Sequence, residues 1–280
     1  MTMVNEEMTD KKDNTKNKEE TTDNKPDPQA PKHSLRLKLR LGPCPKLKEV
    51  RLMVIGKSKR GKSSVANTVL GEDHFSVSSS FSQNIYSGWH QLTRDGRSID
   101  ITEMPTDLSS DEAARPLITI TPGPHAIILC FRCEQFFTPE DYYAYTTLKK
   151  WLGSHFSKYV ILAVSGLDNI AGDGAEDMVR NSFVPILREL PSPDRFICLD
   201  NTANWDSRRQ QGDKLLRLVD QVANDNGGGH FSNRKIRSFE QEMQYQLGRG
   251  KTRAEIKRRV VDGDDLEHVF AKQCSSCVVS

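Results

Sequence analysis

The chain has 280 residues, which is enough for one sizeable domain with appendages or for two small domains. Its 40 Lys and Arg residues nearly balance its 38 Asp and Glu residues, and a net charge of +2 gives no general case for nucleic-acid binding. No apolar run approaches the roughly 18 residues that a membrane-spanning helix needs, so we expect no transmembrane helix and a cytoplasmic location.

The sequence begins with a polar segment. Residues 1–33 contain almost no large apolar side chain, and we expect them to be disordered. Residues 34–41 then alternate apolar and basic residues. This alternation predicts an edge strand with its leucines on one face, and the alternative is a basic strip that meets anionic lipid. We assign residues 1–47 to a disordered N-terminal segment that includes this basic and apolar strip.

Strand and helix signals alternate from Arg51 to about Asn224, which predicts an α/β domain with a mostly parallel sheet covered on both faces. The expected strands are apolar runs at residues 52–55, 126–131, 159–164 and 196–199. One helix should begin after Thr138, which precedes a proline and two acids, and another should cover residues 214–222. In the first helix, large side chains at spacings of three and four should face the core: Tyr142, Tyr145, Leu148, Leu152 and Phe156.

The strongest motif fits the pattern G-x-x-x-x-G-K-[ST] and lies between an expected strand and an expected helix. Its two glycines let the loop wrap a diphosphate with the N–H groups turned inward. Lys62 places an ammonium on the β- and γ-phosphates, and the Ser63 hydroxyl ligates Mg²⁺. The motif therefore predicts a nucleotide-binding protein. The three basic side chains before Gly61 would add positive potential to the site, and the alternative is that they are solvated surface residues. The predicted phosphate site consists of Gly56, Lys57, Ser58, Lys59, Arg60, Gly61, Lys62, Ser63 and Ser64.

Three phrases resemble the immunity-associated nucleotide-binding proteins, the GIMAP family of AIG-type GTPases. They are residues 51–56 (RLMVIG), residues 67–71 (NTVLG) and residues 122–126 (PGPHA). The similarity runs from Arg51 to about Asn226. It implies a P-loop GTPase-like three-layer fold that binds GTP or GDP with Mg²⁺. It also implies a homo-oligomer, or a hetero-oligomer with related GTPases, formed across the nucleotide face.

The resemblance further implies roles for three switch residues. Ser82 replaces a threonine that closes on Mg²⁺ and the γ-phosphate, and a mobile polar loop is the alternative there. Glu103 replaces the aspartate of the second switch, and it could hold Mg²⁺ through water at one methylene greater reach. Thr106 replaces the glycine whose N–H meets the γ-phosphate, and it restricts φ. The last two departures weaken the case for γ-phosphate sensing and for hydrolysis, so catalytic residues stay unassigned.

Base recognition in this family uses an aspartate that follows a buried strand, and Asp168 takes that place. Its carboxylate can accept hydrogen bonds from the ring N–H and the exocyclic amino group of guanine. A helix N-cap is the alternative role for Asp168. Leu167 could pack on the base where related GTPases often have lysine, and Asn201 lies in the loop expected beside the base.

A glycine-rich stretch after Asn226 ends the GTP-binding domain, which we place at residues 48–228. Residues 229–273 form a charged helical extension, in which residues 235–261 predict a solvated helix or a helix pair interrupted at 248–250. Residues 274–280 form a lipidation motif, because Cys277 stands in the C-a-a-X pattern for prenylation and Cys274 is a candidate palmitoyl site. An unmodified disordered tail is the alternative. A basic stretch lies upstream, at Arg249, Lys251, Arg253, Lys257, Arg258 and Arg259.

Together these features predict a guanine-nucleotide-binding protein that lies peripherally on the cytosolic face of a membrane, tethered through its C-terminal lipid. We expect a nucleotide-gated assembly module with slow or absent GTP hydrolysis and no nucleic-acid partner. One alternative is a nucleotide-binding scaffold whose degenerate switch does not sense the γ-phosphate. The other is a GTPase that dimerisation stimulates.

Overall fold

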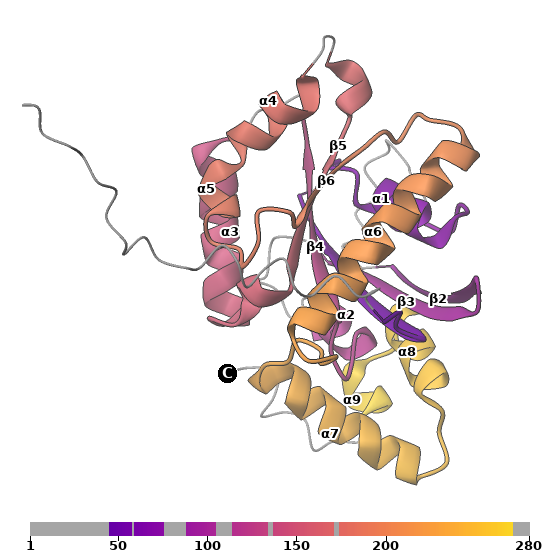
Figure 1. Cartoon of the computed structure of the whole chain (residues 1–280). Coiled ribbons are helices and arrows are strands. Elements are labelled where there is room, and N and C mark those ends of the chain that lie inside the picture. Colours follow the sequence, from indigo (N-terminus) through magenta and orange to yellow (C-terminus); the bar gives the residue numbers. More distant parts are fainter. Residues whose placement is uncertain are drawn as a thin grey trace, which may run out of the picture. The chain divides into compact units, whose positions relative to one another are not determined.

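The computed structural model describes residues 45–57, 59–75, 88–104, 114–133, 137–170 and 174–270. A six-stranded sheet of order β2-β3-β1-β4-β5-β6 runs through the domain (Figure 1). Neighbouring strands are parallel except for β2, which pairs antiparallel with β3. The strands are β1 (Glu49–Ile55), β2 (Trp89–Arg94), β3 (Arg97–Met104), β4 (Ala126–Arg132), β5 (Val160–Ser165) and β6 (Phe196–Leu199).

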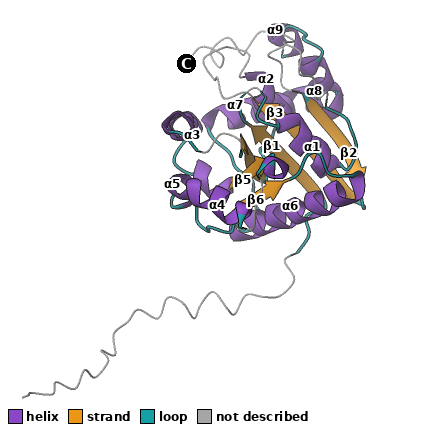
Figure 2. Ribbon diagram, turned by 90° about the horizontal axis from the view of Figure 1, so that it is seen from above, coloured by secondary structure: helices purple, strands orange, loops and turns teal. Residues whose placement is uncertain are grey.

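Helices cover both faces of the sheet, so the domain has the expected three-layer α/β fold (Figure 2). The longest of them, α6, packs with α1 on one face, whereas α3 and α7 lie on the other. The helices are α1 (Lys62–Leu70), α2 (Ala114–Thr119), α3 (Pro139–Leu152), α4 (Ala175–Ser182), α5 (Val184–Leu187), α6 (Trp205–Asp225), α7 (Arg234–Gly248), α8 (Arg253–Val261) and α9 (Leu266–Val269). Two short 3-10 helices, η2 (Phe156–Tyr159) and η3 (Leu167–Asn169), flank β5.

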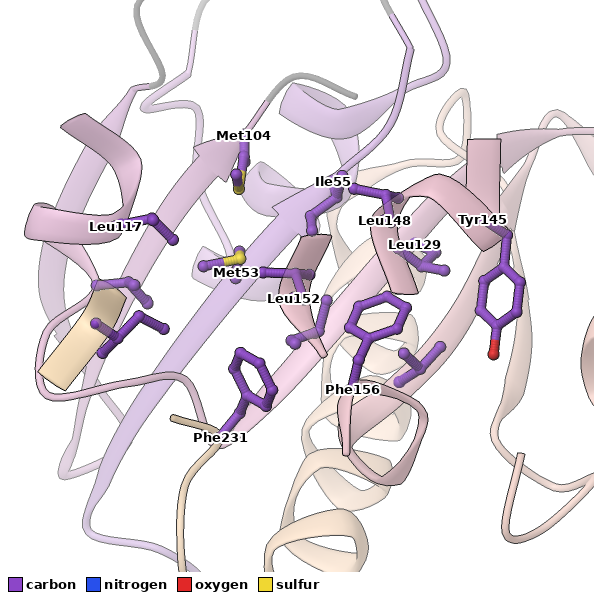
Figure 3. Packing of buried hydrophobic residues seen from close by; sticks show 14 of the residues in the cluster. Met53, Ile55, Met104, Leu117, Leu129, Tyr145, Leu148, Leu152, Phe156 and Phe231 are labelled. Atoms are coloured by element: carbon purple, nitrogen blue, oxygen red, sulfur yellow. The ribbon is translucent and has the colours of Figure 1, made fainter. Parts of the chain in front are cut away.

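Side chains of β1 alternate between two hydrophobic cores. Leu52 and Val54 face the core under α1 and α6, whereas Met53 and Ile55 face the larger core on the other side. This alternation follows from the two-residue period of a strand. In the larger core, Met53 and Ile55 lie among side chains from α3 and from the segment before α7, including Phe231 (Figure 3). The central strands are therefore buried on both faces, and the polar loops lie at their ends.

The four strands and both helices expected from the sequence are present, but the boundaries differ. The 214–222 helix is the second half of α6, which begins after the N-cap Asn204. The sequence analysis did not identify β2 and β3, because neither contains a continuous apolar run like those of the central strands. β2 is the partly exposed edge strand, whereas most of β3 is buried beside β1.

Helix α3 begins as expected, at a capping box between Thr138 and Asp141 with a proline in the first turn. The predicted core stripe is correct for Tyr145, Leu148 and Leu152. It is wrong for Tyr142, which is 37% exposed and donates a hydrogen bond to Glu189 Oε1 at 2.7 Å. Phe156 is buried but belongs to η2, since α3 ends before Gly153.

The C-terminal extension is a helix pair, α7 and α8, and its interruption falls where it was expected. The prediction that it is solvated is wrong. Ile236 and Phe239 of α7 and Ile256 of α8 are buried in the larger core. The extension is therefore packed as part of the domain, and its sparse apolar residues are enough because nearly all of them face inward.

A buried ion pair also joins the extension to the sheet. Lys257 Nζ of α8 lies 2.5 Å from Asp100 Oδ2 of β3, and both side chains are less than 5% exposed. Asp100 accepts a second hydrogen bond from the Trp89 indole of β2. Among the described residues, none of the helices combines the length and the apolar character needed to cross a membrane.

Candidate functional site

The P-loop connects β1 to α1, and its two motif glycines are required by their surroundings. A Cβ at Gly56 would lie 2.9 Å from the backbone oxygen of Cys130 in β4. Gly61 has a φ of 82°, and a Cβ there would lie 2.6 Å from Ser165 Oγ. A side chain at either position would collide with a neighbouring strand, so both positions of the loop require glycine.

The motif lysine folds back over its own loop. Lys62 Nζ donates hydrogen bonds to the backbone oxygens of Gly56 at 2.8 Å and Lys57 at 3.2 Å. Because Lys62 is the first residue of α1, the ammonium group and the N-terminal end of the helix face the same loop. Positive charge and inward-turned N–H groups at this point are what a bound polyphosphate requires.

Asp141 was not expected in the site, and it holds two basic residues of the P-loop. Its side chain is 2% exposed, and its Oδ1 lies 3.2 Å from Lys57 Nζ and 3.5 Å from Arg60 Nη2. The solvated-surface alternative is therefore wrong for Arg60, whose side chain is 13% exposed, whereas the Lys57 side chain is 39% exposed and both meets solvent and pairs with Asp141. Lys59 takes the left-handed conformation, with a φ of 62°. The sequence placed Asp141 in the first turn of this helix, but its contact with the P-loop depends on the packing of α3.

A small cavity lies behind the P-loop, between the loop and α3. Its volume is about 20 Å³, and Gly56, Arg60, Asp141 and Tyr145 are among its lining residues. This is room for about one water molecule, so the cavity is too small to be a nucleotide site. It belongs to the packing that supports the loop, and a nucleotide would bind on the loop's other side.

Glu103 stands at the end of β3, where it pairs in register with Val54 of β1. The Ser63 hydroxyl and the Lys62 ammonium both lie close enough to its carboxylate to favour the charged form. Burial raises the pKa of Glu103, while the Ser63 hydroxyl and the Lys62 charge partly oppose the rise. Its Oε1 is buried and has no hydrogen-bond partner among the described residues. An unpartnered carboxylate oxygen beside a serine hydroxyl fits the hard oxygen ligands that Mg²⁺ prefers.

Two further loops meet the P-loop from β5 and β6. Ser165 ends β5, and its hydroxyl lies against Gly61 while it donates to the Phe131 oxygen at 3.2 Å. The Asn201 amide nitrogen lies 3.3 Å from the position of a Cβ on Gly61, and its Oδ1 is buried without a partner among the described residues. The structure therefore brings Asn201 to the P-loop. Ser165 is a contact that the sequence analysis missed.

The base-recognition residues lie in η3, directly after β5. Asp168 is exposed, and Leu167 is half-buried and packs against the larger core. Asp168 is inside η3, whose N-cap is Gly166, and α4 begins after Gly174, so the N-cap alternative for Asp168 is wrong. The carboxylate of Asp168 is therefore accessible to a ligand, whereas Leu167 is fixed by its packing against the larger core.

Several predicted residues lie outside the described part of the chain. They are Ser58 of the P-loop, Ser82 and Thr106 of the two switches, Cys274 and Cys277 of the lipidation motif, and the basic and apolar strip at 34–41. The residues of the predicted site that the structure does bring together at the P-loop are Gly61, Lys62, Ser63, Glu103 and Asn201.

These features define a class of protein. A strand, a glycine loop and a helix follow one another, an acidic residue ends the neighbouring parallel strand, and polar loops from the next strands meet the glycines. This is the arrangement of a P-loop G domain. The chain belongs to the AIG1 family, whose model matches residues 50–251.

Curated relatives are similar at low identity. The chain is 24% identical over 214 residues to GTPase IMAP family member 8 of Homo sapiens, covering 74% of this chain and 31% of that protein. It is 26% identical over 198 residues to immune-associated nucleotide-binding protein 13 of Arabidopsis thaliana, covering 65% of this chain and 58% of that protein. The chain thus spans about a third to three-fifths of the length of these two relatives.

A solved structure shows the same fold. The crystal structure of a dimerization-deficient mutant of Toc33 from Arabidopsis thaliana superposes with a TM-score of 0.52 at 15% identity, covering 64% of this chain and 86% of that one. This likeness supports the three-layer P-loop GTPase fold, and the sequence match supports the family.

Proposed function

We propose that this chain binds a guanine nucleotide with Mg²⁺ and works as a nucleotide-gated assembly module on the cytosolic face of a membrane. The observation that carries the nucleotide part is the convergence at Gly61. There the P-loop meets Ser165 from β5 and Asn201 from β6, so phosphate-binding and base-side loops form one site. The names of the relatives, GTPase IMAP family member and immune-associated nucleotide-binding protein, agree with this assignment.

Guanine selectivity rests on Asp168. Its exposed carboxylate can accept hydrogen bonds from both N–H groups on the Watson–Crick edge of guanine, and adenine cannot offer that pair. Leu167 stands beside it as an apolar surface for the base, and the unpartnered Asn201 Oδ1 is a further acceptor at the P-loop. These three residues would orient the purine, while Lys62 and the α1 N-terminus hold the phosphates.

Ser63 and Glu103 would hold Mg²⁺, which when bound neutralises phosphate charge. Ser63 brings its hydroxyl to the Glu103 carboxylate, whose other oxygen is unpartnered among the described residues. Glutamate at this place reaches further than aspartate, and it is one reason to propose slow or absent hydrolysis. Thr106, in the second switch, is the other.

Assembly and membrane association are further parts of the proposal. Toc33, the solved protein with the same fold, has a mutant described as dimerization-deficient, which supports self-association across such a domain. Cys277 in the C-a-a-X pattern supports a prenyl tether, with Cys274 as a second lipid site. Cys277→Ser should shift the protein from the membrane to the soluble fraction of eukaryotic cells, and an unchanged distribution would remove the tether from the proposal.

Binding of a fluorescent GTP analogue tests the site. Ser63→Ala and Lys62→Met should each weaken Mg²⁺-dependent binding by at least tenfold. The first removes a hydroxyl ligand of Mg²⁺, and the second removes the ammonium group that contacts the phosphates. Lys214→Met, on the exposed face of α6, is the matched control and should bind as wild type does. Equal binding by all three variants would contradict the assigned site.

Light scattering separates the gated module from its two alternatives. A larger oligomer with GTP than with GDP would support gating by the nucleotide. Equal GDP and GTP affinities with no change in size would support the scaffold that the departures at Glu103 and Thr106 favour. Turnover that rises steeply with protein concentration would support a dimerisation-stimulated GTPase instead.

A further inference from the structure

The outer face of α7 carries a row of side chains that the nucleotide site does not use. Exposed residues recur along α7 at spacings of three and four, which places them on one side of the helix. At 1.5 Å per residue, the row is about 22 Å long. We name it the α7 stripe, and it consists of Arg234, Arg237, Gln241, Gln244, Tyr245 and the C-cap residue Arg249.

The inner face of α7 fixes the stripe to the domain. Ile236, Phe239 and Met243 are buried in the larger core, together with residues of β1 and α3. Figure 1 shows α7 at the lower end of the domain, beside α9. The stripe therefore faces outward from a packed helix whose position the core determines.

The stripe is positively charged although the chain is nearly neutral, with 40 basic and 38 acidic residues. It has three guanidinium groups and no carboxylate. Of the two acids of α7, Glu240 accepts two hydrogen bonds from Arg253 at 2.7 Å and one from the stripe residue Gln244 at 2.6 Å. Glu242 accepts one from the neutral Gln246 amide at 2.9 Å, so it leaves one negative charge beside the three guanidinium groups. Within the described part of the chain, Arg234 and Arg237 form no ion pair.

The basic stretch seen in the sequence does not supply this surface. Three of its members are held in ion pairs: Arg253 with Glu240, Lys257 with Asp100, and Arg259 with Asp264 at 2.7 Å, the last of these at the surface. Only Arg249 of that stretch belongs to the stripe. The basic surface is therefore a helix face that begins at Arg234, fifteen residues before the basic stretch identified in the sequence.

We propose that the α7 stripe docks the domain on an anionic lipid surface, an inference that rests on the proposed membrane association. Guanidinium groups in a row match a plane of phosphate and carboxylate headgroups, and each basic residue near such a surface adds roughly fivefold to binding. Tyr245 is 54% exposed and suits the membrane–water interface, where tyrosine is enriched. Its ring lies 5.8 Å from the Arg249 guanidinium, so the two side chains form one unit.

The position of the proposed tether favours lipid over nucleic acid. Cys277 is seven residues beyond Phe270, so it lies within about 25 Å of that residue. Phe270 is buried in the same core as the inner face of α7. A lipid on Cys277 would therefore hold the domain within reach of a bilayer. A single-stranded nucleic acid needs several interleaved aromatic platforms, and the stripe has one tyrosine.

Vesicle sedimentation with full-length protein from bacteria tests the inference without any attached lipid. R234Q/R237Q/R249Q should lower partitioning onto phosphatidylserine-containing vesicles by on the order of a hundredfold at low salt. The matched control, R188Q/K214Q/R217Q, removes the same charge from exposed positions on and beside α5 and α6 and should bind as wild type does. The N-terminal basic residues are the same in all three proteins, so the comparison isolates α7.

Three outcomes would overturn the inference: equal loss in both triple variants, equal wild-type binding to phosphatidylcholine vesicles alone, or tighter binding of a single-stranded oligonucleotide than of the anionic vesicles. Thermal melting of each variant checks folding, and R237E alone replaces the triple variant if the latter melts early. Titration of GTP into the same variants keeps the two proposals apart. Weak binding of wild type to anionic vesicles together with normal GTP binding contradicts only the stripe, whereas a wild-type protein that does not bind GTP contradicts the proposed nucleotide site.

Discussion

Breaking the buried ion pair between α8 and β3 should strongly destabilise the domain, and removing Asp100 should cost more than removing Lys257. Lys257 and Asp100 are 3% and 4% exposed, and removing one partner of such a pair leaves an uncompensated buried charge at a cost of about 3–5 kcal/mol. Arg51 and Arg253 are both close enough to disfavour the Lys257 charge. Asp100→Asn therefore leaves Lys257 among like charges, and its cost should lie near 5 kcal/mol.

Lys257→Met should cost less, about 3 kcal/mol, because Arg253 and the Trp89 indole still interact with the Asp100 carboxylate. In the double variant neither charge is buried alone, so its cost should fall below the sum of the two single costs by 2 kcal/mol or more. Urea denaturation followed by far-UV circular dichroism measures all three values. Fluorescence is less suitable, since Trp89 itself contacts the pair.

The surface pair between Arg209 and Asp95 provides the control. Its side chains are 53% and 59% exposed at a distance of 2.7 Å, so Arg209→Met should change the free energy of unfolding by less than about 1 kcal/mol. Single-variant costs below 1 kcal/mol at Lys257 and Asp100, or a larger cost at Lys257 than at Asp100, would refute the reasoning.

Three further predictions concern the site and its support. Gly61→Ala should abolish GTP binding in calorimetry, because its Cβ would lie 2.6 Å from Ser165 Oγ at a φ of 82°; wild-type affinity would contradict the assigned loop geometry. Asp141→Ala should lower the urea midpoint more than Asp141→Asn, because asparagine keeps an oxygen for the α3 cap and loses only the charge facing the P-loop; equal midpoints would contradict the capping role of Asp141. Burial, helped by Arg51 and His230, lowers the pKa of His125 to about 3, so the unfolded chain binds more protons between pH 6.5 and 3 and stability falls as pH falls. Acid titration of unfolding should show a slope shallower by up to about 1.4 kcal/mol per pH unit in His125→Gln, and parallel curves would contradict it.

The nucleotide loop was predictable because its requirements are local. Gly56, Gly61 and Lys62 act through backbone conformation and through their place between a strand and a helix, and both can be seen in a short stretch of sequence. The structure adds the reason, since each glycine faces a neighbouring strand end that no local pattern reveals. Glu103 and Asn201 were assigned from the family pattern, and the structure brings both of them to the P-loop.

The features that the sequence did not reveal all depend on tertiary neighbours. Asp141 was expected only as one of two acids in the first turn of a helix, and the packing of α3 brings its Oδ1 to Lys57. Lys257 appeared to be one of several solvated bases, but Asp100, 157 residues away along the chain, compensates its burial. Tyr142 fits the helical period of the core stripe, yet its hydroxyl reaches Glu189 at the surface. Periodicity identifies a face of a helix, but it does not identify which residue at the edge of that face stays exposed.

The most direct test of the proposed function is calorimetric titration of GTP and ATP, with Mg²⁺, into wild-type protein and Asp168→Asn. Asp168 is exposed within η3, so the substitution should leave the fold intact. It turns an acceptor of the guanine N–H groups into a group that also donates. We predict that wild type binds GTP at least a hundredfold more tightly than ATP and that Asp168→Asn loses this preference while it gains affinity for xanthosine triphosphate. Equal affinity of wild type for GTP and ATP, or an unchanged preference in the variant, would contradict the assignment of a guanine-nucleotide site.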